Sequence, residues 1–562
     1  MPNHKILNIP ASNIPLQNYL TKELGISKIV AQVLINRGLE SIDEAGRFLN
    51  PNPSQFLDPY SFSDMDKAVS LVRKACEKKE GVMVFGDYDA DGLTALTLLK
   101  EALKRIGLEA AHYIPHRIRE GYGLTKNILQ LAKQKNIKLL ITVDCGISSY
   151  EEIEELSRND IKTIITDHHE PSSQRLPPAH SILNPKIKDS GYKYRDLAGV
   201  GVAYKLAQAL CGTKRLEDLD LVTLGTIADS APLIGENRVI VKEGLPRLSQ
   251  TKRLGIRALI DNAGIKNKKF TSTYVSFILG PRINASGRLD SAEASLKLLM
   301  SQTQEEASEL ARILEAHNRE RQRVEGKILE EAADLIAKEI NFKEHKVIVL
   351  AKEGWHQGVL GIVASKLADR FYRPAIIISL SGALCKGSAR SIKNFHLFDA
   401  LVECREFLSS FGGHAHAAGI VIDKDNIEDF KNTLNRIAEN KMSVEHLLPS
   451  LDIDMQLGLA DIDERMVLEL ERLEPFGEGN PQPLFYTKDL ALKGEPCVLS
   501  RDTLKFWVSD GKNTYQAIGF GMGCFKDSLK SSDGFDLVYS PKIDSWQGDE
   551  SVLLEAKDII FR

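Results

Sequence analysis

Short apolar runs alternate with helix-like segments in the first half of the chain. Val82–Phe85, Leu139–Val143 and Thr163–Thr166 are continuous apolar or β-branched runs, whereas residues 93–106 repeat their apolar positions at helical spacing. Short buried strands separated by helices are typical of a parallel sheet with crossover helices. The pattern therefore predicts an α/β domain with a parallel sheet over residues 61–300.

The rest of the chain divides into four further regions. Apolar positions at helical spacing indicate a small helical segment within residues 1–60. Residues 301–340 contain no proline and one glycine, and their apolar residues recur at helical intervals, so we expect one long connecting helix. Strands and helices alternate again over 341–445, with a helix over 397–408, which predicts a second α/β domain. Alternating strands with turn signals over 450–562 predict a small all-β barrel or sandwich.

Composition adds limits rather than new features. The 562 residues suggest several domains, and 73 Lys and Arg against 77 Asp and Glu leave a net charge of −4, so any nucleic-acid surface must be local. Seven scattered cysteines without a C-x-x-C pair argue against a disulfide framework and a zinc ribbon, which favours a reducing compartment. Since the N-terminus lacks a secretory pattern and no apolar run is long enough to span a bilayer, we expect a cytoplasmic protein with no membrane contact.

Three carboxylates follow the first strand-like run. Asp87, Asp89 and Asp91 stand at alternate positions directly after it, where the loops of a parallel sheet form a ligand crevice. A solvated acidic turn or the start of a calcium loop is the competing interpretation. A calcium loop needs a bidentate Glu at its twelfth position, which is Leu98 here, and the flanking helix pair is missing. A different kind of metal site is therefore favoured.

The next two strands also end in side chains that bind metals. Asp144 follows one of them, and Asp167, His168 and His169 follow the other. A lone Asp in this place is often a helix cap and a lone His is often structural, but here three successive strands deliver such groups to one edge. Mixed carboxylate and imidazole ligands suit Mn²⁺ or Mg²⁺ better than zinc. Two ions about 4 Å apart generate an attacking hydroxide and stabilise a leaving oxygen, which points to phosphate-ester hydrolysis.

In combination these motifs resemble those of the DHH phosphoesterase superfamily. The likeness rests on Asp87 to Asp91, Asp144, Asp167 to His169 and the segment Gly225–Asp229, and it extends to the bacterial branch of single-strand-specific 5′-to-3′ DNA exonucleases. Many members of the superfamily begin the first motif with a His, which this chain lacks, and that departure fits the exonuclease branch. Taken alone, Asp229 is explained equally well as a metal ligand or as a helix C-cap or surface acid.

The resemblance implies a role for each of these residues. Asp144 would bridge two ions, and Asp87 would be either a further ligand or an outer acid. His169 would contact the scissile phosphate or assist the leaving group, and Asp167 would orient a neighbouring imidazole. The ligands of two Mn²⁺ or Mg²⁺ ions would come from Asp87, Asp89, Asp91, Asp144, His168 and Asp229.

The second α/β region carries two candidate phosphate-binding motifs. Gly412 and Gly413 precede His414, and glycines let a backbone approach a phosphate while the imidazole donates a hydrogen bond. A glycine-rich turn beside a packed His is common, but the motif resembles the substrate motif of the DHH-associated domain. Ser388 and Arg390 resemble a clamp for the 5′ phosphate of the substrate, which Arg binds in bidentate fashion. A surface ion pair is the alternative for Arg390.

Further basic and aromatic residues would line the path of the strand. Arg117 would meet a phosphate and Tyr122 would stack on a base, unless Tyr122 is a core residue and Arg117 is solvated. Arg282 and Arg288 precede the long helix and would contact the backbone of the strand between the domains. In the terminal β region the aromatic residues around Trp507 usually indicate a core, but the resemblance implies an OB-like domain that binds single-stranded DNA.

These features together predict a metal-dependent exonuclease. We expect it to hydrolyse single-stranded DNA in the 5′-to-3′ direction, to release 5′-mononucleotides, and to act in recombination and repair. The resemblance further implies a single-strand-binding protein and a RecQ-type helicase as partners, and a monomer is the default expectation. Two alternatives stay open, namely a phosphodiesterase of short oligoribonucleotides or cyclic dinucleotides and a DNA-binding scaffold with a decayed nuclease site. The complete set of acids and imidazoles argues against the scaffold.

Overall fold

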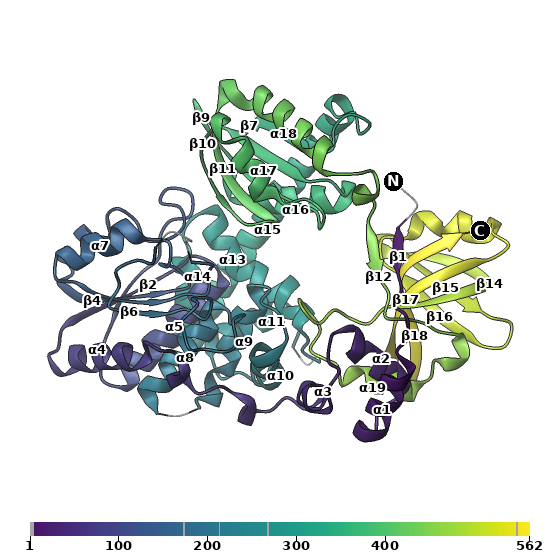
Figure 1. Ribbon diagram of the computed structural model, residues 1–562, viewed down its shortest axis with the longest axis horizontal. Coiled ribbons are helices and arrows are strands. Elements are labelled where there is room, and N and C mark those ends of the chain that lie inside the picture. Colours follow the sequence, from purple (N-terminus) through teal and green to yellow (C-terminus); the bar gives the residue numbers. More distant parts are fainter. Residues whose placement is uncertain (1–4, 172–174, 213, 267–268, 547–548, 562) are drawn as a thin grey trace. The chain divides into compact units, whose positions relative to one another are not determined.

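The computed structural model describes residues 5–171, 175–212, 214–266, 269–546 and 549–561, which form two compact units. The first unit comprises Leu57–Ala231 and Glu243–Pro449, and the second comprises Lys5–Phe56, Pro232–Lys242 and Ser450–Arg562. Figure 1 labels most helices and strands of both units. No helix in the described part of the chain is both long and apolar enough to cross a membrane.

The first sheet of the first unit is parallel throughout, as the alternating pattern predicted. Its central strands are buried along almost their whole length, so each forms a continuous apolar run in the sequence. Gly86 pairs with Val143, and Val143 pairs with Thr166, so three strands end at one edge. In spatial order the strands are β3 (Ala111–Tyr113), β2 (Gly81–Gly86), β4 (Ile137–Val143), β5 (Lys162–Thr166) and β6 (Ser181–Leu183).

Helices cover both faces of this sheet (Figure 1). On one face α6 (Ile128–Gln134) and α7 (Tyr150–Arg158) share an apolar cluster with the strands. On the other face lie α4 (Met65–Glu77), α5 (Ala90–Arg105) and α8 (Gly199–Cys211), with α9 (Leu219–Ala228) packed against α5 and α8. Helix α5 begins three residues before the predicted start because Asp89 caps it.

A series of helices follows along the chain and leads to the second sheet. These are α10 (Gly235–Ser249), α11 (Leu254–Asn262), α12 (Ser272–Tyr274), the π-helical turn η4 (Val275–Leu279), α13 (Gly280–Leu289) and α14 (Glu293–Leu299). The long helix expected over 301–340 is present as α15 (Gln304–Glu339), which Thr303 caps through its side chain. Both α13 and α14 pack against α15.

The second sheet of this unit is mixed. Its order is β10 (Leu408–Gly413), β11 (Ala417–Asp423), β9 (Leu384–Arg390), β8 (Ala375–Leu380) and β7 (Ile348–Glu353), with β7 and β8 parallel and the other neighbours antiparallel. One face packs on α15 and α16 (Leu360–Phe371), and the other on α17 (Leu397–Glu403) and α18 (Ile427–Lys441). The helix predicted over 397–408 is wrong at its end, because the chain enters β10 at Leu408 and pairs with β11.

The second unit is a closed β-barrel with helices packed into its core. The barrel order is β13 (Met455–Gln456), β14 (Phe485–Leu499), β15 (Thr503–Ser509), β16 (Thr514–Gly519), β18 (Asp549–Phe561) and β17 (Phe535–Trp546), and β17 also pairs with β14. One apolar cluster joins the barrel to α1 (Ile14–Leu24), α2 (Lys28–Asn36), α3 (Ile42–Leu49) and α19 (Glu464–Glu471). In addition β1 (Ile6–Asn8) pairs in parallel with β12 (Ser450–Asp452). The N-terminal helices therefore complete the core of the C-terminal barrel, a grouping that the sequence pattern did not indicate.

Candidate metal centre

The first acidic motif lies in the turn between β2 and α5. Asp89 caps the helix, since its Oδ1 accepts hydrogen bonds from the backbone N–H groups of Asp91 (3.0 Å) and Gly92 (3.1 Å). Capping occupies one oxygen of Asp89 and leaves the other for a ligand. Asp87 is buried, and its Oδ1 has no hydrogen-bond partner among the described residues. The same short turn thus starts a helix and presents carboxylates.

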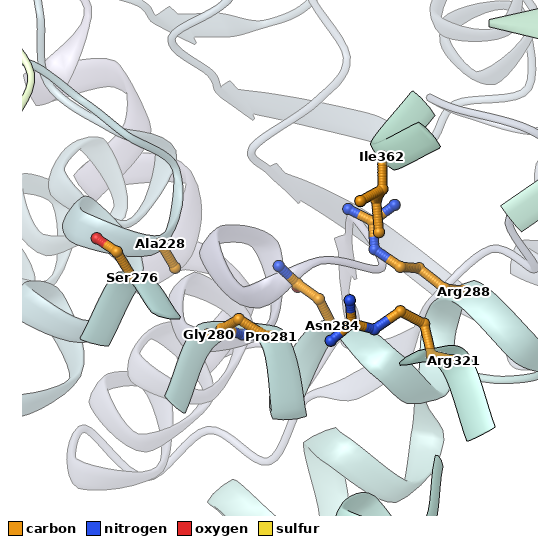
Figure 2. Close-up of a pocket in the computed structure, with 8 residues that line it drawn as sticks. All are labelled: Ala228, Ser276, Gly280, Pro281, Asn284, Arg288, Arg321 and Ile362. Atoms are coloured by element: carbon orange, nitrogen blue, oxygen red, sulfur yellow. The ribbon is translucent and has the colours of Figure 1, made fainter. Parts of the chain in front are cut away.

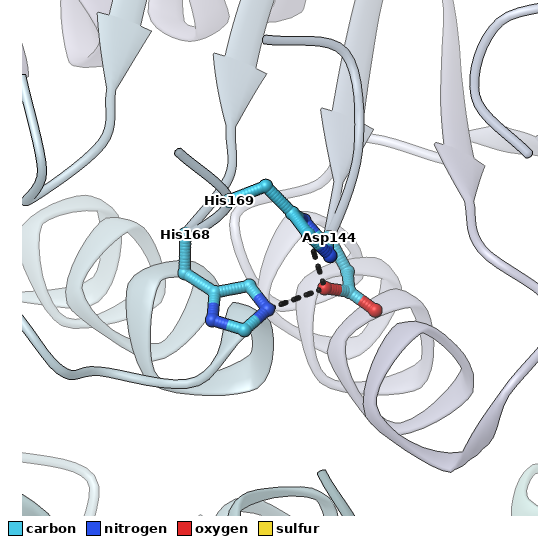
Figure 3. A group of neighbouring side chains, drawn as sticks. All are labelled: Asp144, His168 and His169. Atoms are coloured by element: carbon cyan, nitrogen blue, oxygen red, sulfur yellow. Dashed lines mark ion pairs between the residues drawn. The ribbon is translucent and has the colours of Figure 1, made fainter. Parts of the chain in front are cut away.

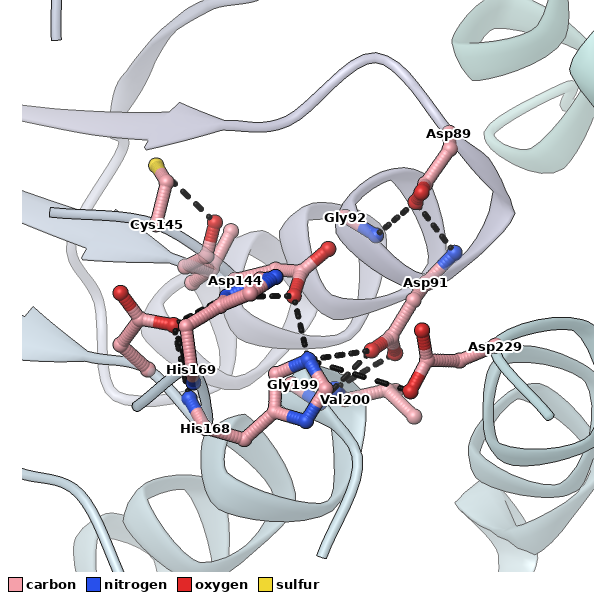
Figure 4. Close-up of polar contacts among 12 residues, drawn as sticks. Asp89, Asp91, Gly92, Asp144, Cys145, His168, His169, Gly199, Val200 and Asp229 are labelled. Atoms are coloured by element: carbon pink, nitrogen blue, oxygen red, sulfur yellow. Dashed lines mark hydrogen bonds and ion pairs between the residues drawn. The ribbon is translucent and has the colours of Figure 1, made fainter. Parts of the chain in front are cut away.

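The N-terminus of α8 holds the carboxylate of Asp91. The backbone N–H of Gly199 donates to Asp91 Oδ2 (2.7 Å), and that of Val200 donates to Oδ1 (2.8 Å), as Figure 4 shows. Free N–H groups and the positive end of the helix dipole both stabilise a negative charge at this place. Asp91 is therefore fixed by backbone groups from a helix more than one hundred residues away in the sequence.

Asp144 follows β4 in a left-handed backbone conformation, with φ at 59°. Helix α8 approaches it closely, because a methyl group on Gly199 would stand 2.6 Å from both the Cβ and the Oδ1 of Asp144. Asp144 is buried, and its Oδ1 lacks a hydrogen-bond partner among the described residues. The close packing of α8 therefore holds the carboxylate in place, although no described residue donates a hydrogen bond to its Oδ1.

His168 joins the acids of the different motifs. Its Nε2 lies 3.1 Å from Asp144 Oδ1 and 3.8 Å from both Asp91 Oδ2 and Asp229 Oδ2 (Figures 3 and 4). Asp229 is also the C-cap of α9, so the cap and the site interpretations of its sequence position both hold. The potential ligand atoms form three groups, which are Asp144 with His168 and His169, Asp91 with His168 and Asp229, and Asp87 with Asp89 and Asp144.

Asp167 and His169 form a second arrangement beside these groups. The fully buried Asp167 accepts the Nδ1–H of His169 (2.8 Å) through Oδ1 and the backbone N–H of Ile147 (2.9 Å) through Oδ2. The Nδ1 contact leaves Nε2 of His169 with one long polar contact among the described residues, 3.5 Å to the Tyr122 hydroxyl. The Tyr122 hydroxyl donates to the carbonyl of Asp144 (3.2 Å) and lies 2.9 Å from His169 Nδ1. Tyr122 is 46% exposed, so it is not a core residue and it borders the site.

Burial and mutual repulsion shift the ionisation of the acids. Burial, followed by the negative charge of Asp89, raises the pKa of Asp91 to about 7. Burial and the charge of Asp91 raise the pKa of Asp144 well above its usual range, and the same causes act on Asp229. Burial lowers the pKa of His168 to about 3, which keeps the imidazole neutral and able to bind a cation. The site therefore has more negative charge than its own cations balance.

The residues present fit a divalent metal centre. Three buried polar atoms without a hydrogen-bond partner among the described residues, Asp87 Oδ1, Asp144 Oδ1 and His168 Nε2, belong to the three groups of potential ligands. A buried polar atom without a partner costs about 1–3 kcal/mol, so these atoms need a ligand that the chain does not supply. Carboxylate-rich sites with imidazole suit Mn²⁺ and Mg²⁺.

Replacing Gly199 by Ala should disturb this centre strongly. The added Cβ would meet the side chain of Asp144 at 2.6 Å, so the carboxylate or helix α8 must shift. We expect Mn²⁺ affinity to fall by about 10- to 100-fold, as it does when groups that orient metal ligands are altered. Calorimetric titration of Mn²⁺ without DNA measures it. Gly326→Ala on α15, where nothing stands within 4 Å of an added Cβ, is the control, and equal Mn²⁺ affinity of both variants would contradict the expectation.

A cationic pocket adjoins the acids. Its cavity of about 240 Å³ has a lining that includes Asn284, Arg288 and Arg321, as Figure 2 shows, together with Ala228 beside Asp229. Burial, followed by the positive charges of nearby arginines, lowers the pKa of Arg288 to about 9. Those arginines are Arg117, Arg321 and Arg390. Arg321 is paired with Glu325, whereas Arg288 donates to a backbone carbonyl, and arginines that line a pocket in this way are suited to bind an anion such as phosphate.

The mixed sheet contributes the remaining predicted contacts. Ser388 and Arg390 lie on the same side of β9, and an added Cβ at Gly361 of α16 would stand 3.0 Å from Ser388 Oγ and 3.1 Å from Arg390 Nη2. Gly412 and Gly413 end β10, and the backbone N–H of His414 donates to Ala417 (2.8 Å). Burial and then the charge of His169 lower the pKa of His414.

Two predicted substrate residues have contacts of their own within the protein. Arg282 forms an ion pair with Glu315 of α15 (2.7 Å) and donates to the carbonyl of Ile278 (2.8 Å), so the structure does not bring it into the cationic pocket. The guanidinium of Arg117 stands 4.9 Å from the ring centre of Tyr88 and contributes to the field at Arg288. Arg117 is therefore neither fully solvated nor far from the site.

Sequence reasoning missed three residues that shape the site, Gly199, Asn284 and Arg321. Gly199 is identified only by how closely α8 approaches Asp144. Arg321 is a buried cation on α15, where it donates to Glu325 (2.6 Å) and Asn318 (2.6 Å). The sequence contained one signal for Arg321. Three polar residues at helical spacing interrupt the apolar stripe of α15 between Leu314 and Ile328, and they are Asn318, Arg321 and Glu325.

Three family models match successive parts of the chain. The DHH family, N-terminal domain, matches residues 81–226, the DHHA1 domain matches 344–440, and the RecJ OB domain matches 453–558. These ranges contain the parallel sheet, the mixed sheet and most of the barrel. The order of the three matches agrees with the order of the predicted regions.

The chain is also similar to whole proteins. The single-stranded-DNA-specific exonuclease RecJ of Bacillus subtilis (strain 168) is 38% identical over 542 residues, which cover 96% of this chain and 69% of that protein. The chain belongs to the RecJ family. RecJ from Thermus thermophilus in complex with Mn²⁺ matches with a TM-score of 0.86 at 28% identity and covers 100% of this chain and 80% of that one. Its complex with Mg²⁺ matches with a TM-score of 0.77 at 27% identity, over 99% and 78%.

Membership of the RecJ family confirms the predicted fold class. The parallel DHH sheet, the second α/β domain after a long helix, and the all-β OB-like domain are all present. The superfamily resemblance stated from the acidic and histidine motifs is confirmed as well.

Proposed function

We propose that this RecJ-family chain hydrolyses single-stranded DNA from the 5′ end and releases 5′-mononucleotides, using two Mn²⁺ or Mg²⁺ ions. The proposal rests on one observation. Buried acids and the His168 imidazole, which have polar atoms without a hydrogen-bond partner among the described residues, lie beside a pocket lined by arginines. The first arrangement suits divalent ions and the second suits a phosphate. The related proteins are named single-stranded-DNA-specific exonucleases, and the Thermus protein was solved with each of the two ions.

The ligand assignment follows the three groups of neighbouring atoms. Asp144 belongs to two of the groups and its carboxylate has two oxygens, so Asp144 would be shared by both ion positions, whereas the single acceptor nitrogen of His168 would bind one ion. The full set would be Asp87, Asp89, Asp91, Asp144, His168 and Asp229. When bound, two such ions supply a nucleophile from water and neutralise charge at the phosphate. The raised pKa values of the acids would return toward normal once this charge is balanced.

His169 would act on the phosphate or on the leaving oxygen. The hydrogen bond that His169 Nδ1–H donates to Asp167 fixes the ring, and it raises the pKa of His169 although burial by itself lowers it. A protonated Nε2–H can then donate to a phosphate oxygen or to the departing oxygen. Asp167 would keep the imidazole oriented without touching the substrate.

Arg390→Ala should remove the preference for a 5′-phosphorylated end. Loss of a charged hydrogen-bond donor to phosphate costs about 1.5–3 kcal/mol, which is about 10- to 100-fold in kcat/KM. A substrate with a 5′ hydroxyl should be cut at an unchanged rate, since it offers no such partner. Competition between the two substrates measures the ratio. Arg370→Ala, on the exposed side of α16, is the control, and an unchanged ratio in Arg390→Ala would reject this role.

The remaining regions would hold and guide the strand. We assign catalysis to residues 61–300, substrate binding to 341–445 across the connecting helix 301–340, and strand binding to 450–562 together with the helical segment 1–60. In the barrel Phe506 is buried, whereas Trp507 is 44% exposed on the same face as its cross-strand neighbours Lys493 and Gln516. An exposed ring beside a cation suits base stacking along a strand.

A single-stranded DNA about 30 nucleotides long, labelled separately at each end, tests the function. Incubated with Mn²⁺, it should release a labelled 5′-mononucleotide at once, while duplex stays intact. Cleavage confined to a dinucleotide would keep the metal site and move the chain to phosphodiesterases of short substrates. If none of these substrates is cleaved, the chain would instead be a DNA-binding scaffold with a decayed nuclease site.

Family membership also supports a place in DNA recombination and repair inside the cell. A single-strand-binding protein and a RecQ-type helicase are the partners we propose, with the chain itself acting as a monomer in the cytoplasm. Size-exclusion chromatography with light scattering measures the oligomeric state. Co-elution with each purified partner measures the two interactions.

A further inference from the structure

Helix α13 docks on the turn that carries the first acidic motif. The side chain of Asn284 on α13 accepts the backbone N–H of Ala90 through Oδ1 at 2.7 Å. Asn284 also lines the cationic pocket (Figure 2). No acid or imidazole motif of the sequence contains this residue.

The contact from Asn284 completes the N-terminus of α5. The first N–H groups of a helix have no partner inside it. Here Asp89 Oδ1 accepts those of Asp91 and Gly92, and Asn284 accepts that of Ala90. Without Asn284 the Ala90 N–H would lose its partner in a part-buried place, and the turn that carries Asp89 would lose one of its anchors.

Gly287 brings α13 against the same turn. A Cβ at Gly287 would stand 2.8 Å from the carbonyl oxygen of Tyr88 and 3.4 Å from the Cβ of Ala292. The helix can therefore approach the turn this closely only with glycine at the position. Asn284 and Gly287, three residues apart, lie on one face of α13.

Arg288 is held on the same helix, one turn beyond Asn284. Its Nη1 donates to the carbonyl of Gly358 in the DHHA1 region (3.3 Å), and its side chain lines the pocket. A Cβ at Gly358 would overlap the carbonyl of Arg288, so the two backbones touch there as well. Helix α13 thus connects the acidic turn, the arginine pocket and the DHHA1 region through three neighbouring residues.

We propose that Asn284 is a positioning residue that fixes α13 on the Tyr88–Ala90 turn and so sets the distance between the metal ligands and Arg288. This distance determines how far a bound 5′ phosphate stands from the phosphodiester that is cut. The assignment rests on the proposed function, since it presumes ions at the acids and a phosphate at the arginines. Asn284 acts through its hydrogen bond to the Ala90 N–H and through the place of Arg288 on the same helix.

Mn²⁺ titration without DNA tests the acceptor role directly. In Asn284→Ala the Ala90 N–H has no acceptor, and we expect Mn²⁺ to bind about 10- to 100-fold more weakly. In Asn284→Asp the acceptor oxygen is retained at a helix N-terminus that favours negative charge, so affinity should return to within about threefold of the unaltered chain. Equal affinity in Asn284→Ala and the unaltered chain, or failure of Asn284→Asp to restore it, would overturn the proposal.

Substrate preference supplies the second readout. Because α13 carries Arg288, the ratio of kcat/KM for 5′-phosphorylated over 5′-hydroxyl DNA should fall at least about tenfold in Asn284→Ala. Asn262→Ala, an exposed asparagine on α11, should change neither the ratio nor the affinity. A loss of overall rate with an unchanged ratio would show that Asn284 does not set the distance to the pocket.

Gly287→Ala tests the same docking from a second atom. It leaves Asn284 in place and moves α13 away from Tyr88, so it should lower the Mn²⁺ affinity and the phosphate preference together. Unchanged values in this variant would contradict the docking model even where Asn284→Ala fails to fold. If the unaltered chain itself binds no Mn²⁺, the proposed function fails, whereas normal binding by the chain and by both α13 variants removes only the role of α13.

Discussion

Asp144→Asn should abolish hydrolysis while leaving the fold intact. Asp144 belongs to two of the three groups of potential ligands, so the substitution affects both ion positions. Each ion contributes several kcal/mol of charge stabilisation in such reactions, and we expect a loss of about three orders of magnitude or more in kcat with Mn²⁺. Release of the labelled 5′ nucleotide measures the loss.

The same variant should not be less stable than the unaltered chain when metal is absent. Burial and the charges of Asp91 and Asp89 disfavour the carboxylate of Asp144, and Asn keeps its shape without the charge. DNA binding measured by anisotropy with chelator should also be retained. Asp334→Asn, an exposed acid on α15, is the matched control and should cut normally. More than a tenth of normal activity in Asp144→Asn would reject the assignment of both ion positions.

The metal-free chain should lose stability as the pH rises from 5 to 8. Burial and the charge of Asp89 raise the pKa of Asp91 from its ordinary value of 3.8 to about 7, so the folded state binds this proton more tightly than the unfolded state. The stabilisation is complete below pH 3.8 and is lost as the pH passes 7. A shift of this size corresponds to roughly 4 kcal/mol for Asp91 alone. Thermal unfolding in chelator measures the trend.

Several groups oppose the trend over part of the range, namely the histidines whose pKa is lowered, His168, His180, His356 and His414. The pKa of His168 is lowered to about 3 from 6.5, chiefly by burial, so this residue adds stability as the pH rises to 6.5 and nothing beyond it. The acids with raised pKa outnumber these histidines, and they are Asp87, Asp91, Asp144 and Asp229 of the site together with Asp218, Asp369 and Asp454. The net fall should therefore be steepest above pH 6.5.

Added Mn²⁺ should reverse this dependence. Ions bind the deprotonated acids, so affinity and stabilisation both rise with pH. At a hundredfold excess over Kd each bound ion adds about 2.7 kcal/mol. In Asp144→Asn the fall with pH should be smaller and the reversal should be lost. A metal-free chain whose stability is constant from pH 5 to 8 would show that the acids do not repel one another in the folded state.

The sequence predicted the elements whose burial is continuous. Strands β2, β4 and β5 are apolar along their length, so their positions, their parallel order and the acids at their ends could all be inferred. Helix α15 was equally clear, since a long periodic stretch without proline has few alternatives. The predicted end of the helix over 397–408 was wrong. The residues after α17 include further apolar positions, so the pattern did not show where the helix stops, and the pairing of β10 with β11 decides the conformation of residues 408–413.

Local sequence by itself thus determined the parallel sheet, the acidic edge and the chemistry expected there, because strand burial and metal-ligand type depend on residues a few positions apart. Tertiary structure alone decided the contacts between distant segments. Gly199 N–H reaches Asp91 across 108 residues, and Asn284 reaches Ala90 across 194. Tertiary structure also packed the N-terminal helices against the barrel, so that they share its apolar core. Such contacts depend on how closely two backbones pack, and no periodicity of apolar residues records that distance.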